Sequence, residues 1–496
     1  MSGKLDFEFS TASGSQSQRQ KEDPFVMLVL GNFGGQADAH ADDPSWLMQV
    51  PIRNVDLDNI EELWAHFKPC LKIEVDGVNI VFTPTELEDF HPDQLYRHLP
   101  VFEQLRQTRK RLLDPVTAQD TLNKLVQNQP TSEDGNQMFE RLLGNKSSAS
   151  PVPTSKPPGS GPMPSDLDRL LHHAVAAQIV PDEDPRVDSA INAVDTAIST
   201  IMRGILHQPE FQRLESSWRS LYDLIYDSEI GEQLLLKVCN VDKQALLAGL
   251  PESIETMHES GLYQLLAGRQ KRAIDDAGYS LLVCDYYFGH HADDIVLLAA
   301  LANLAELNDA AILGAAKSEL TGTASIAQQP DFTHWRKVDN PMWAQLRNSS
   351  AANRIGLAIP RVLGRLPYGD RGEQVDSFDF EEQSPAEYDV ANHGSFLWSN
   401  PSFRLAGLLA KSFTENGWKM QPEDHCDIGG LPAFIYSADD EQRMLPTAET
   451  LLSERTAQAI MQLGLMPIVS LRNRDMARLI RFQSIASPPE ALKGPW

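Results

Sequence analysis

Residues 24–35 of the chain read PFVMLVLGNFGG, and this stretch anchors the interpretation of the whole sequence. The apolar run Phe25–Leu30 leads directly into a glycine-rich segment, a pattern typical of a buried strand entering a turn. Glycines can also let backbone amides approach a phosphate, but Gly31–Gly35 lacks the G-K-[ST] ending of a Walker loop and the helix-opening G-x-G-x-x-G of a dinucleotide site. We therefore predict a tight turn at the exit of a buried strand.

The sequence on either side of this strand alternates between strand and helix patterns. Upstream, Lys4–Ser10 places Leu5, Phe7 and Phe9 on one face, which predicts a half-buried strand set apart from the rest by a polar spacer. Downstream, the expected elements are a helix over 57–67, a hairpin turning at Asp76–Gly77 and a helix over Gln94–Leu113. Residues 1–143 are thus expected to form a small α+β segment.

A change of composition marks the middle of the chain. In Gly144–Ser165, GNKSSASPVPTSKPPGSGPMPS, proline, serine and glycine replace every periodic apolar pattern, which predicts an interdomain linker. Residues 166–231 then contain two stretches, 191–205 and 211–225, in which apolar residues recur every three or four positions. These stretches predict an antiparallel helical hairpin.

The remaining residues, 232–496, alternate between buried-strand and helix patterns. The clearest elements are strands at Gln233–Val241, Tyr279–Val283 and Ala310–Ala315 and a helix over Asp293–Glu306. Such alternation predicts a mixed α/β body. The expected fold class is therefore α+β to mixed α/β, with a small segment, a linker, a helical hairpin and a larger body.

The bulk composition is that of a soluble globular protein large enough for more than one core. Of its 496 residues, 42% are hydrophobic and 23% are charged. The 43 basic and 69 acidic side chains give a formal net charge of -26. A field of that sign repels phosphate backbones and anionic headgroups, so we expect neither nucleic acid nor a membrane surface as a partner.

Cysteine spacing and hydropathy indicate the compartment. Cys70, Cys239, Cys284 and Cys426 lack the short spacings of zinc sites or of a disulfide framework, and are read as reduced thiols. The N-terminus has no apolar signal-peptide region, and no later run has the length of a membrane span. We expect a cytoplasmic protein without direct membrane insertion.

One dense group of potential metal ligands occurs in CDYYFGHHADD, namely Asp285, His290, His291, Asp293 and Asp294. Adjacent residues seldom converge on one ion without a loop built for that purpose. Asp293 and Asp294 stand where a helix start favours acidic side chains. Helix capping is therefore the preferred interpretation, and no metal is expected.

Arginines and tryptophans offer two further candidate sites. Arg354, Arg361 and Arg365 could form a basic ligand pocket, but a buried or interfacial strand-loop held by arginine hydrogen bonds is the better interpretation. The aromatic residues that could form a binding platform are read first as core anchors: Trp335, Trp343, Trp398 and Trp418. No Ser-His-Asp, nucleophile-elbow, H-E-x-x-H or paired-carboxylate motif occurs in a catalytic context, so neither an enzyme nor a cofactor is expected.

Several strings resemble the contractile sheath proteins of type VI secretion systems. Two strings resemble the small (TssB/VipA-like) subunit: PFVMLVLGNFGG and FTPTELEDFHPDQLYRHLPVFEQLRQTRKRLLDPV. A sequence motif of that subunit, called the family motif below, corresponds here to Leu87, Asp89, Phe90, Pro92 and Leu95. Five further strings resemble the large (TssC/VipB-like) subunit and occur in the same order as in that family: ILHQPEFQRLESSWRSLYDLI, LLVCDYYF, WAQLRNSSAANRIGLAIPRVLGRLPYG, LWSNPSF and LMPIVSLRNRDMARLIRFQSI. The resemblance covers most of the chain and implies a fusion of the two subunits.

The resemblance also implies two interaction segments. Leu5, Phe7 and Phe9 match the small subunit's terminal strand, which pairs with neighbouring subunits; pairing within the chain's own fold is the alternative. The helix near 166–177 resembles a segment that recruits a recycling unfoldase in some of these systems, through the apolar face of Leu167, Leu170, Leu171 and Val175. A helix packed on its own domain is the alternative there.

The expected function is that of a structural sheath component that takes part in assembly or contraction. Implied partners are itself or other type VI sheath subunits, with the inner tube, the baseplate and the recycling AAA+ unfoldase as further partners. The family's large-subunit pattern usually continues well past the stretch QSI (residues 483–485), whereas this sequence stops at Trp496. The large part therefore looks C-terminally truncated, which motivates an alternative: an accessory or capping protein that binds the sheath end or baseplate without polymerising.

Overall fold

The computed structural model describes residues 23–35, 46–75, 77–127, 186–251, 258–268, 278–383, 390–438 and 441–496. We call 23–127 the N-terminal part and 186–496 the C-terminal part. The strands are β1 (Phe25–Gly31), β2 (Ile52–Val55), β3 (Leu71–Val75), β4 (Val78–Phe82), β5 (Leu234–Asn240), β6 (Leu281–Phe288), β7 (Ala311–Ala316), β8 (Ile355–Ile359), β9 (Val362–Leu363), β10 (Trp398–Ser399), β11 (Asp427–Ile428), β12 (Ile435–Ala438), β13 (Glu441–Met444), β14 (Met466–Ser470) and β15 (Ala477–Leu479).

Helices are present throughout both parts. They are α1 (Ile60–Phe67), α2 (Pro92–His98), α3 (Glu103–Leu113), α4 (Ala118–Gln127), α7 (Arg186–Leu206), α8 (Pro209–Asp227), α9 (Lys243–Ala248), α10 (Gly261–Tyr263), α11 (Ala292–Leu307), α12 (Pro341–Arg347), α13 (Pro401–Asn416) and α14 (Glu454–Gln462). The mixture of helices and strands confirms the predicted fold class. No helix among the described residues is both long enough and apolar enough to cross a membrane.

The centre of the molecule is a nine-stranded sheet in the order β11-β15-β14-β8-β7-β6-β1-β5-β2. The strands from β14 to β5 in this order run parallel to their neighbours, whereas β2, β15 and β11 pair antiparallel. β1, β7 and β8 are buried along their whole length, as expected for parallel strands covered on both faces. β1 comes from the N-terminal part, so the two parts share one sheet.

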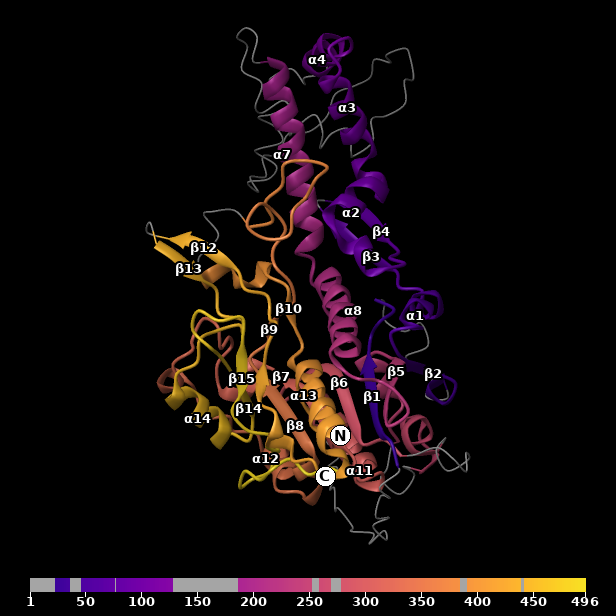
Figure 1. Cartoon of the computed structure of the whole chain (residues 1–496), viewed down its shortest axis with the longest axis vertical. Coiled ribbons are helices and arrows are strands. Elements are labelled where there is room, and N and C mark those ends of the chain that lie inside the picture. Colours follow the sequence, from indigo (N-terminus) through magenta and orange to yellow (C-terminus); the bar gives the residue numbers. More distant parts are fainter. Residues whose placement is uncertain are drawn as a thin grey trace, which may run out of the picture.

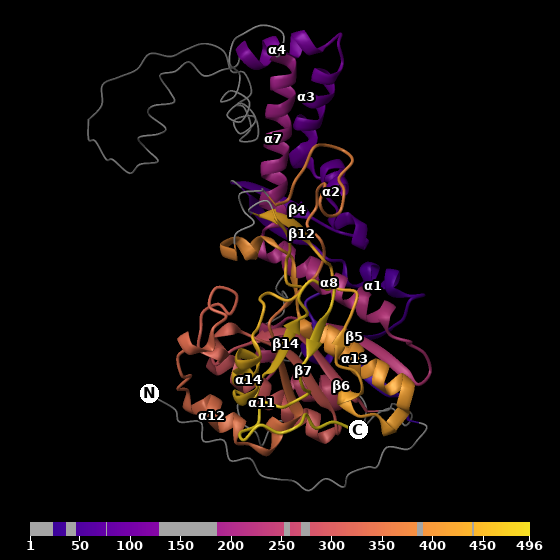
Figure 2. The same cartoon turned by 60° about the vertical axis from the view of Figure 1, so that its left-hand side comes forward.

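Helices cover both faces of this sheet. Side chains alternate along β1, so that Met27 packs in one core with residues of α8 and α13, and Leu28 packs in a second core with residues of α11. Above the sheet, α3, α4 and α7 lie side by side and form an elongated arm (Figure 1). The same arm is seen in profile in Figure 2.

The predicted strands around the sheet are confirmed, with small shifts of their ends. β1, β5 and β7 match three predicted buried strands to within one residue, whereas β6 begins two residues and ends five residues later than the predicted strand Tyr279–Val283. α11 covers the predicted helix, and β3 pairs antiparallel with β4 as the predicted hairpin. The predicted helix over 57–67 begins only at Ile60, because Asp56 and Asn59 make a hydrogen-bonded turn and Leu57 is exposed.

Two helix predictions are wrong. The helix expected over Gln94–Leu113 is divided into α2 and α3, because Leu99 is extended and Pro100 cannot continue the hydrogen bonding of α2. The antiparallel hairpin expected within 166–231 is not formed. Instead α7 and α8 follow one another, since extended Gln208 and Pro209 restart the helix in a new direction (Figure 2). α7 packs against α3, whereas α8 packs against α13.

Candidate functional site at the junction of the two parts

Strand β1 places the backbone of the N-terminal part inside the sheet of the C-terminal part. All seven residues of β1 pair in parallel with β5, and Met27–Leu30 pair on the opposite edge with β6. The ladder continues at both ends, where Phe25 N donates to Gln233 O (2.8 Å) and Val241 N donates to Gly31 O (2.9 Å). Without β1, the facing edges of β5 and β6 would expose unpaired backbone groups.

The turn that follows β1 is fixed by a side chain of the C-terminal part. Asn240 Oδ1 accepts hydrogen bonds from Phe33 N (2.9 Å) and Gly34 N (3.0 Å). Gly35 has a φ of +79°, and an added Cβ would lie 2.9 Å from Leu71 Cδ2. The predicted strand-exit turn is confirmed, since these amides face Asn240.

Trp218 of α8 centres an aromatic cluster across the junction. Its indole stacks on that of Trp64 with ring centroids 3.6 Å apart and an interplanar angle of 12°. Phe33 meets the same indole edge-on at 5.5 Å, and Trp218 Nε1 donates to Phe33 O (3.1 Å). Trp218 is fully buried. Large aromatic side chains with a satisfied N–H are strong contributors to such an interface.

A second aromatic group lies about two turns earlier on α8. Phe211 contacts Phe82 of β4 and Phe90, with ring centroids 5.3 Å apart in both pairs. Phe90 is one of the five residues of the family motif. In this motif Asp89 accepts a hydrogen bond from Thr85 N (2.7 Å), Leu95 is buried and Pro92 begins α2. The family motif therefore builds the apolar face that the N-terminal part presents to α8.

Residues 366–383 form a loop that we call the strap, because it runs from the sheet to the arm. Asp93 of α2 accepts hydrogen bonds from Asp376 N (3.1 Å) and Ser377 N (2.9 Å), and Tyr96 packs on Phe378 with ring centroids 4.9 Å apart. Burial raises the pKa of Asp93, but these hydrogen bonds outweigh burial and hold the pKa below its ordinary value. A charged carboxylate at Asp93 is thereby favoured at the junction.

On its other side the strap binds α7, the helix that carries the arm. Arg203 Nε donates to Glu381 O (2.8 Å), and Ser199 Oγ donates to Asp379 O (3.3 Å). The arm itself is held by an ion pair between the two parts, in which Arg109 Nε lies 2.6 Å from Asp195 Oδ1. The hydrogen bond to Asp195 raises the pKa of Arg109.

A buried ionic cluster joins α8 to both ends of the strap region. Arg365 Nε donates to Glu215 Oε1 (2.7 Å), and Arg365 Nη1 donates to Glu382 Oε2 (2.7 Å). Arg219 Nε donates to Glu215 Oε1 (2.9 Å). The side chains of Arg365, Glu215 and Glu382 are only 4%, 0% and 1% exposed. We call these four residues the ionic cluster; two positive charges balance two negative ones.

The side chains of the ionic cluster stabilise one another in their charged forms. Burial raises the pKa of Glu215, but the charges of Arg365 and Arg219 outweigh burial, and the pKa lies below its ordinary value. Burial lowers the pKa of Arg365, and the carboxylates reverse this effect, so its pKa lies well above the ordinary value. Removing one partner of such a cluster leaves a buried uncompensated charge.

Of the other two candidate arginines, Arg354 is buried, whereas the side chain of Arg361 is 35% exposed. Arg354 donates to Ala310 O (3.1 Å) and Asp309 Oδ1 (2.8 Å), and Arg361 Nη2 donates to Glu449 Oε1 (2.6 Å). These contacts confirm the prediction of a loop held by arginine hydrogen bonds. The acidic partners were missed, because Glu215 and Glu382 lie 150 and 17 positions from Arg365.

The histidine and aspartate group is divided between two places. Asp294, in the first turn of α11, accepts from Gly289 N (2.6 Å) and pairs with Lys243 and Lys317. Asp285 instead points to α8, where Ser217 Oγ lies 2.5 Å from its Oδ2. Within the described ranges, no group of three or more His, Cys, Asp or Glu side chains is arranged to hold a metal.

The candidate tryptophans take two positions relative to the cores. Trp343 and Trp398 are buried, and Trp335 and Trp418 are partly buried against the cores. These placements confirm the prediction of core anchors. The interaction segments containing Leu5, Phe7, Phe9, Leu167, Leu170, Leu171 and Val175 lie outside the described residues, as does the predicted linker.

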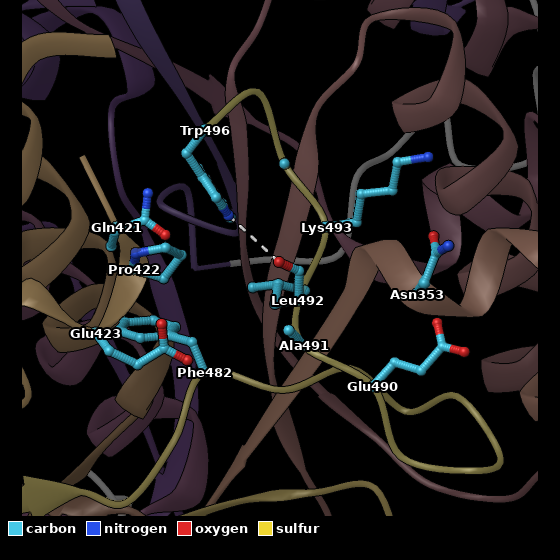
Figure 3. Close-up of a pocket in the computed structure, with 11 residues that line it drawn as sticks. Asn353, Gln421, Pro422, Glu423, Phe482, Glu490, Ala491, Leu492, Lys493 and Trp496 are labelled. Atoms are coloured by element: carbon cyan, nitrogen blue, oxygen red, sulfur yellow. Dashed lines mark hydrogen bonds between the residues drawn. The ribbon is translucent and has the colours of Figure 1, made fainter. Parts of the chain in front are cut away.

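A hollow lies beside the last segment of the chain (Figure 3). Asn353, Phe482, Glu423 and the segment Glu490–Gly494 contribute to its lining, and Trp496 Nε1 donates to Leu492 O (3.3 Å) at its rim. Its polar side chains come from separate elements and make no shared hydrogen bond. The junction, rather than this hollow, is therefore the candidate functional site.

Comparison with known proteins gives matches to both parts. Residues 188–486 match the family described as EvpB/VC_A0108, tail sheath N-terminal domain (VipB). Residues 4–140 match the family described as Type VI secretion system, VipA, VC_A0107 or Hcp2. The chain is 30% identical over 342 residues to the type VI secretion system sheath protein TssC1 of Pseudomonas aeruginosa, an alignment that covers 65% of this chain and 66% of that relative. The chain thus spans just under two thirds of the relative's length.

Proposed function

Because the chain belongs to the tail-sheath family of type VI secretion systems, we propose that it is a structural component of a contractile sheath in which the small-subunit-like and large-subunit-like parts fold as one building block. The observation that carries this proposal is the position of β1 between β5 and β6. A strand paired on both edges in the middle of a sheet is part of the fold, unlike a domain that touches its neighbour only through side chains.

The building block acts through packing, without bond chemistry. Contraction of a sheath is a rearrangement of rigid units in a lattice, and each unit must keep its internal contacts while its outer contacts change. The two aromatic groups, the strap and the ionic cluster supply such internal contacts. Arg365 and Arg219 together neutralise Glu215 and Glu382, which suits a structural role.

Pairing of the two parts within one chain is supported by the arm. α4 ends the described N-terminal part, α7 begins the C-terminal part, and these two helices pack against each other. The segment between them, which includes the predicted linker 144–165, therefore joins two neighbouring helices. Partners in this proposal are further copies of the chain or other type VI sheath subunits, in the cytoplasm.

The two untested interaction segments complete the proposal. Leu5, Phe7 and Phe9 would pair with a neighbouring building block, and the helix with Leu167, Leu170, Leu171 and Val175 would recruit the recycling unfoldase. The predicted boundaries, 1–143, 144–165, 166–231 and 232–496, stay part of the same proposal. The inner tube and the baseplate are the remaining proposed partners.

Electron microscopy of the purified chain tests the proposal. The chain is imaged alone and together with separately made small and large sheath subunits. Tubules that contain the chain along their length support a sheath component, whereas decoration restricted to tube ends supports the capping alternative. No association in either sample would overturn both functions.

A matched pair of variants links assembly to the junction. Val29 of β1 is fully buried, whereas Val81 of β4 is 54% exposed. Val29→Asp places a charge in the middle of the sheet and should abolish incorporation into tubules, while Val81→Asp should leave incorporation unchanged. Equal incorporation of both variants would contradict the proposed role of β1.

A further inference from the structure

Asp285 lies within β6, and its partly buried side chain stands where three segments meet. Its Oδ2 lies 2.5 Å from Ser217 Oγ of α8, and its Cβ lies 3.0 Å from where a Cβ added to Gly31 of β1 would stand. The side chain of Asn400, which caps the start of α13, hydrogen-bonds the same carboxyl. This acid therefore contacts both the N-terminal part and two helices that cover the sheet.

Only the hydrogen bonds of Ser217 and Asn400 favour a negative charge on this carboxyl, and burial outweighs them. Gly31, Ser217 and Asn400 face it from β1, α8 and α13, and all three are uncharged. The titratable neighbours on its own strand are neutral groups whose pKa is itself raised by burial, namely Cys284, Tyr286 and Tyr287. Two ion pairs lie near the neighbouring residues of the strand: Arg361 with Glu449 near Tyr287, and Lys243 with Asp294 near Cys284.

The contacts around Ser217 can use one more proton than an ionised Asp285 provides. Ser217 has a single hydroxyl hydrogen, and two acceptors lie within reach: Asp285 Oδ2 at 2.5 Å and Arg213 O at 2.9 Å. With Asp285 ionised, the hydroxyl can satisfy only one of them. With Asp285 protonated, its O–H donates to Ser217 Oγ, and Ser217 donates onward to Arg213 O, so both contacts are hydrogen bonds.

We propose that Asp285, Ser217 and the Arg213 carbonyl form a proton-operated latch between β6 and α8. When Asp285 takes up a proton from solvent, the chain of hydrogen bonds is complete and α8 is held firmly on the sheet. When the proton is lost, a partly buried anion remains beside β1 and the attachment of α8 weakens. Since Trp218 follows Ser217 on α8, the latch acts directly on the aromatic cluster of the junction.

The direction of the pH dependence follows from burial. Burial raises the pKa of Asp285 from 3.8 to about 6, with only partial opposition from the hydrogen bonds of Ser217 and Asn400. The folded state thus binds this proton more tightly than the unfolded state does. The stabilisation is fully present below pH 3.8 and is lost as the pH rises through about 6.

Asp285→Asn in the full chain tests the latch, because its amide donates to Ser217 at every pH. We measure thermal unfolding midpoints between about pH 4.5 and 8 for the parent, this variant and Asp58→Asn, which removes an exposed carboxylate as the control. Asp285→Asn should match the parent near the acid end and exceed it by several degrees at the alkaline end, whereas Asp58→Asn should follow the parent throughout. A difference between Asp285→Asn and the parent that is the same at every pH would overturn the proposal.

Infrared difference spectroscopy gives a second readout that does not depend on the stability of the variant. The folded parent should show a protonated-carboxyl band that titrates near pH 6. Ser217→Ala, which removes the hydrogen-bond partner, should shift the frequency of this band. Absence of any such band in the folded parent would overturn the proposal, even if Asp285→Asn fails to fold. Neither measurement involves sheath assembly, so this proposal can fail while the proposed function stands.

Discussion

Trp64 and Trp218 stack face to face across the junction, with ring centroids 3.6 Å apart, although they lie in different parts of the chain. Trp64 is on α1 of the N-terminal part, and Trp218 is on α8 of the C-terminal part. The stack is buried, and Trp218 also holds the turn after β1 through its indole N–H. One side chain thus connects the aromatic cluster to the strand that the two parts share.

Trp218→Ala should strongly destabilise the whole fold. It deletes a fully buried indole and opens a cavity, which costs about 3–5 kcal/mol for a large aromatic side chain. Equilibrium unfolding in denaturant measures the loss. The control is Tyr226→Ala on the same helix, because Tyr226 is 69% exposed and its removal should change stability by less than about 0.5 kcal/mol. Similar losses for both variants would show that Trp218 has no special role at the junction.

Arg365→Met should destabilise the protein more than the loss of an ordinary ion pair does. The variant removes the guanidinium that bridges the buried carboxylates of Glu215 and Glu382, and loss of one partner of a buried pair costs about 3–5 kcal/mol. The matched control is Arg213→Met, because Arg213 pairs with Glu210 on the surface of α8 and is 69% exposed. If the denaturation midpoints of the two variants coincide, the ionic cluster does not stabilise the fold.

Glu449 should make the protein sensitive to acid. Burial raises its pKa, but hydrogen bonds from His393 and Arg361 outweigh burial and lower the pKa from 4.5 to about 2. Because the folded pKa is depressed, the stabilisation is present above pH 4.5 and is lost as the pH falls towards about 2. The shift corresponds to about 3 kcal/mol.

Glu449→Gln removes this titration. Unfolding free energies measured between about pH 2 and 6 should fall less steeply with acidification in the variant than in the parent. Asp58→Asn serves again as the exposed control and should keep the parent's slope. An unchanged slope in Glu449→Gln would mean that this carboxylate does not carry the acid sensitivity.

Cleavage between the two parts should leave them associated. A protease site placed in the predicted linker 144–165 permits a single cut after folding. Since β1 is hydrogen-bonded on both edges and the arm is tied by Arg109 and Asp195, the fragments should elute together on size exclusion without denaturant. Separation of the native fragments would show that the covalent connection holds the parts together.

The strand patterns of the sequence were more informative than its helix patterns. Unbroken apolar runs such as Phe25–Leu30 predicted burial correctly, because a strand covered on both faces has no polar side. The same runs do not specify neighbours, so nothing in them placed β1 between β5 and β6, some 200 residues downstream. The predicted hairpin of α7 and α8 was wrong for a related reason: apolar spacing shows that a helix has a buried face, and not which element covers that face.

The candidate site was predictable only in its parts. The ordered family strings predicted a fusion of small-subunit-like and large-subunit-like parts, which the family matches at 4–140 and 188–486 confirm. Arg365 was recognised as a residue that holds a loop, but its partners depend on three-dimensional contacts between α8 and the strap. Asp285 was considered only within a group of potential metal ligands, because its place opposite Ser217 cannot be inferred from local spacing.

The central claim is that the two parts form one sheet. Hydrogen exchange of β1 in the intact chain tests this claim most directly. Amides of Phe25–Leu30 should exchange as slowly as those of β6 and β7, because all three strands are buried in the middle of the same sheet. The four-residue edge strand β2 serves as the internal reference for faster exchange. Exchange of β1 as fast as that of β2, with β6 and β7 still protected, would contradict the account.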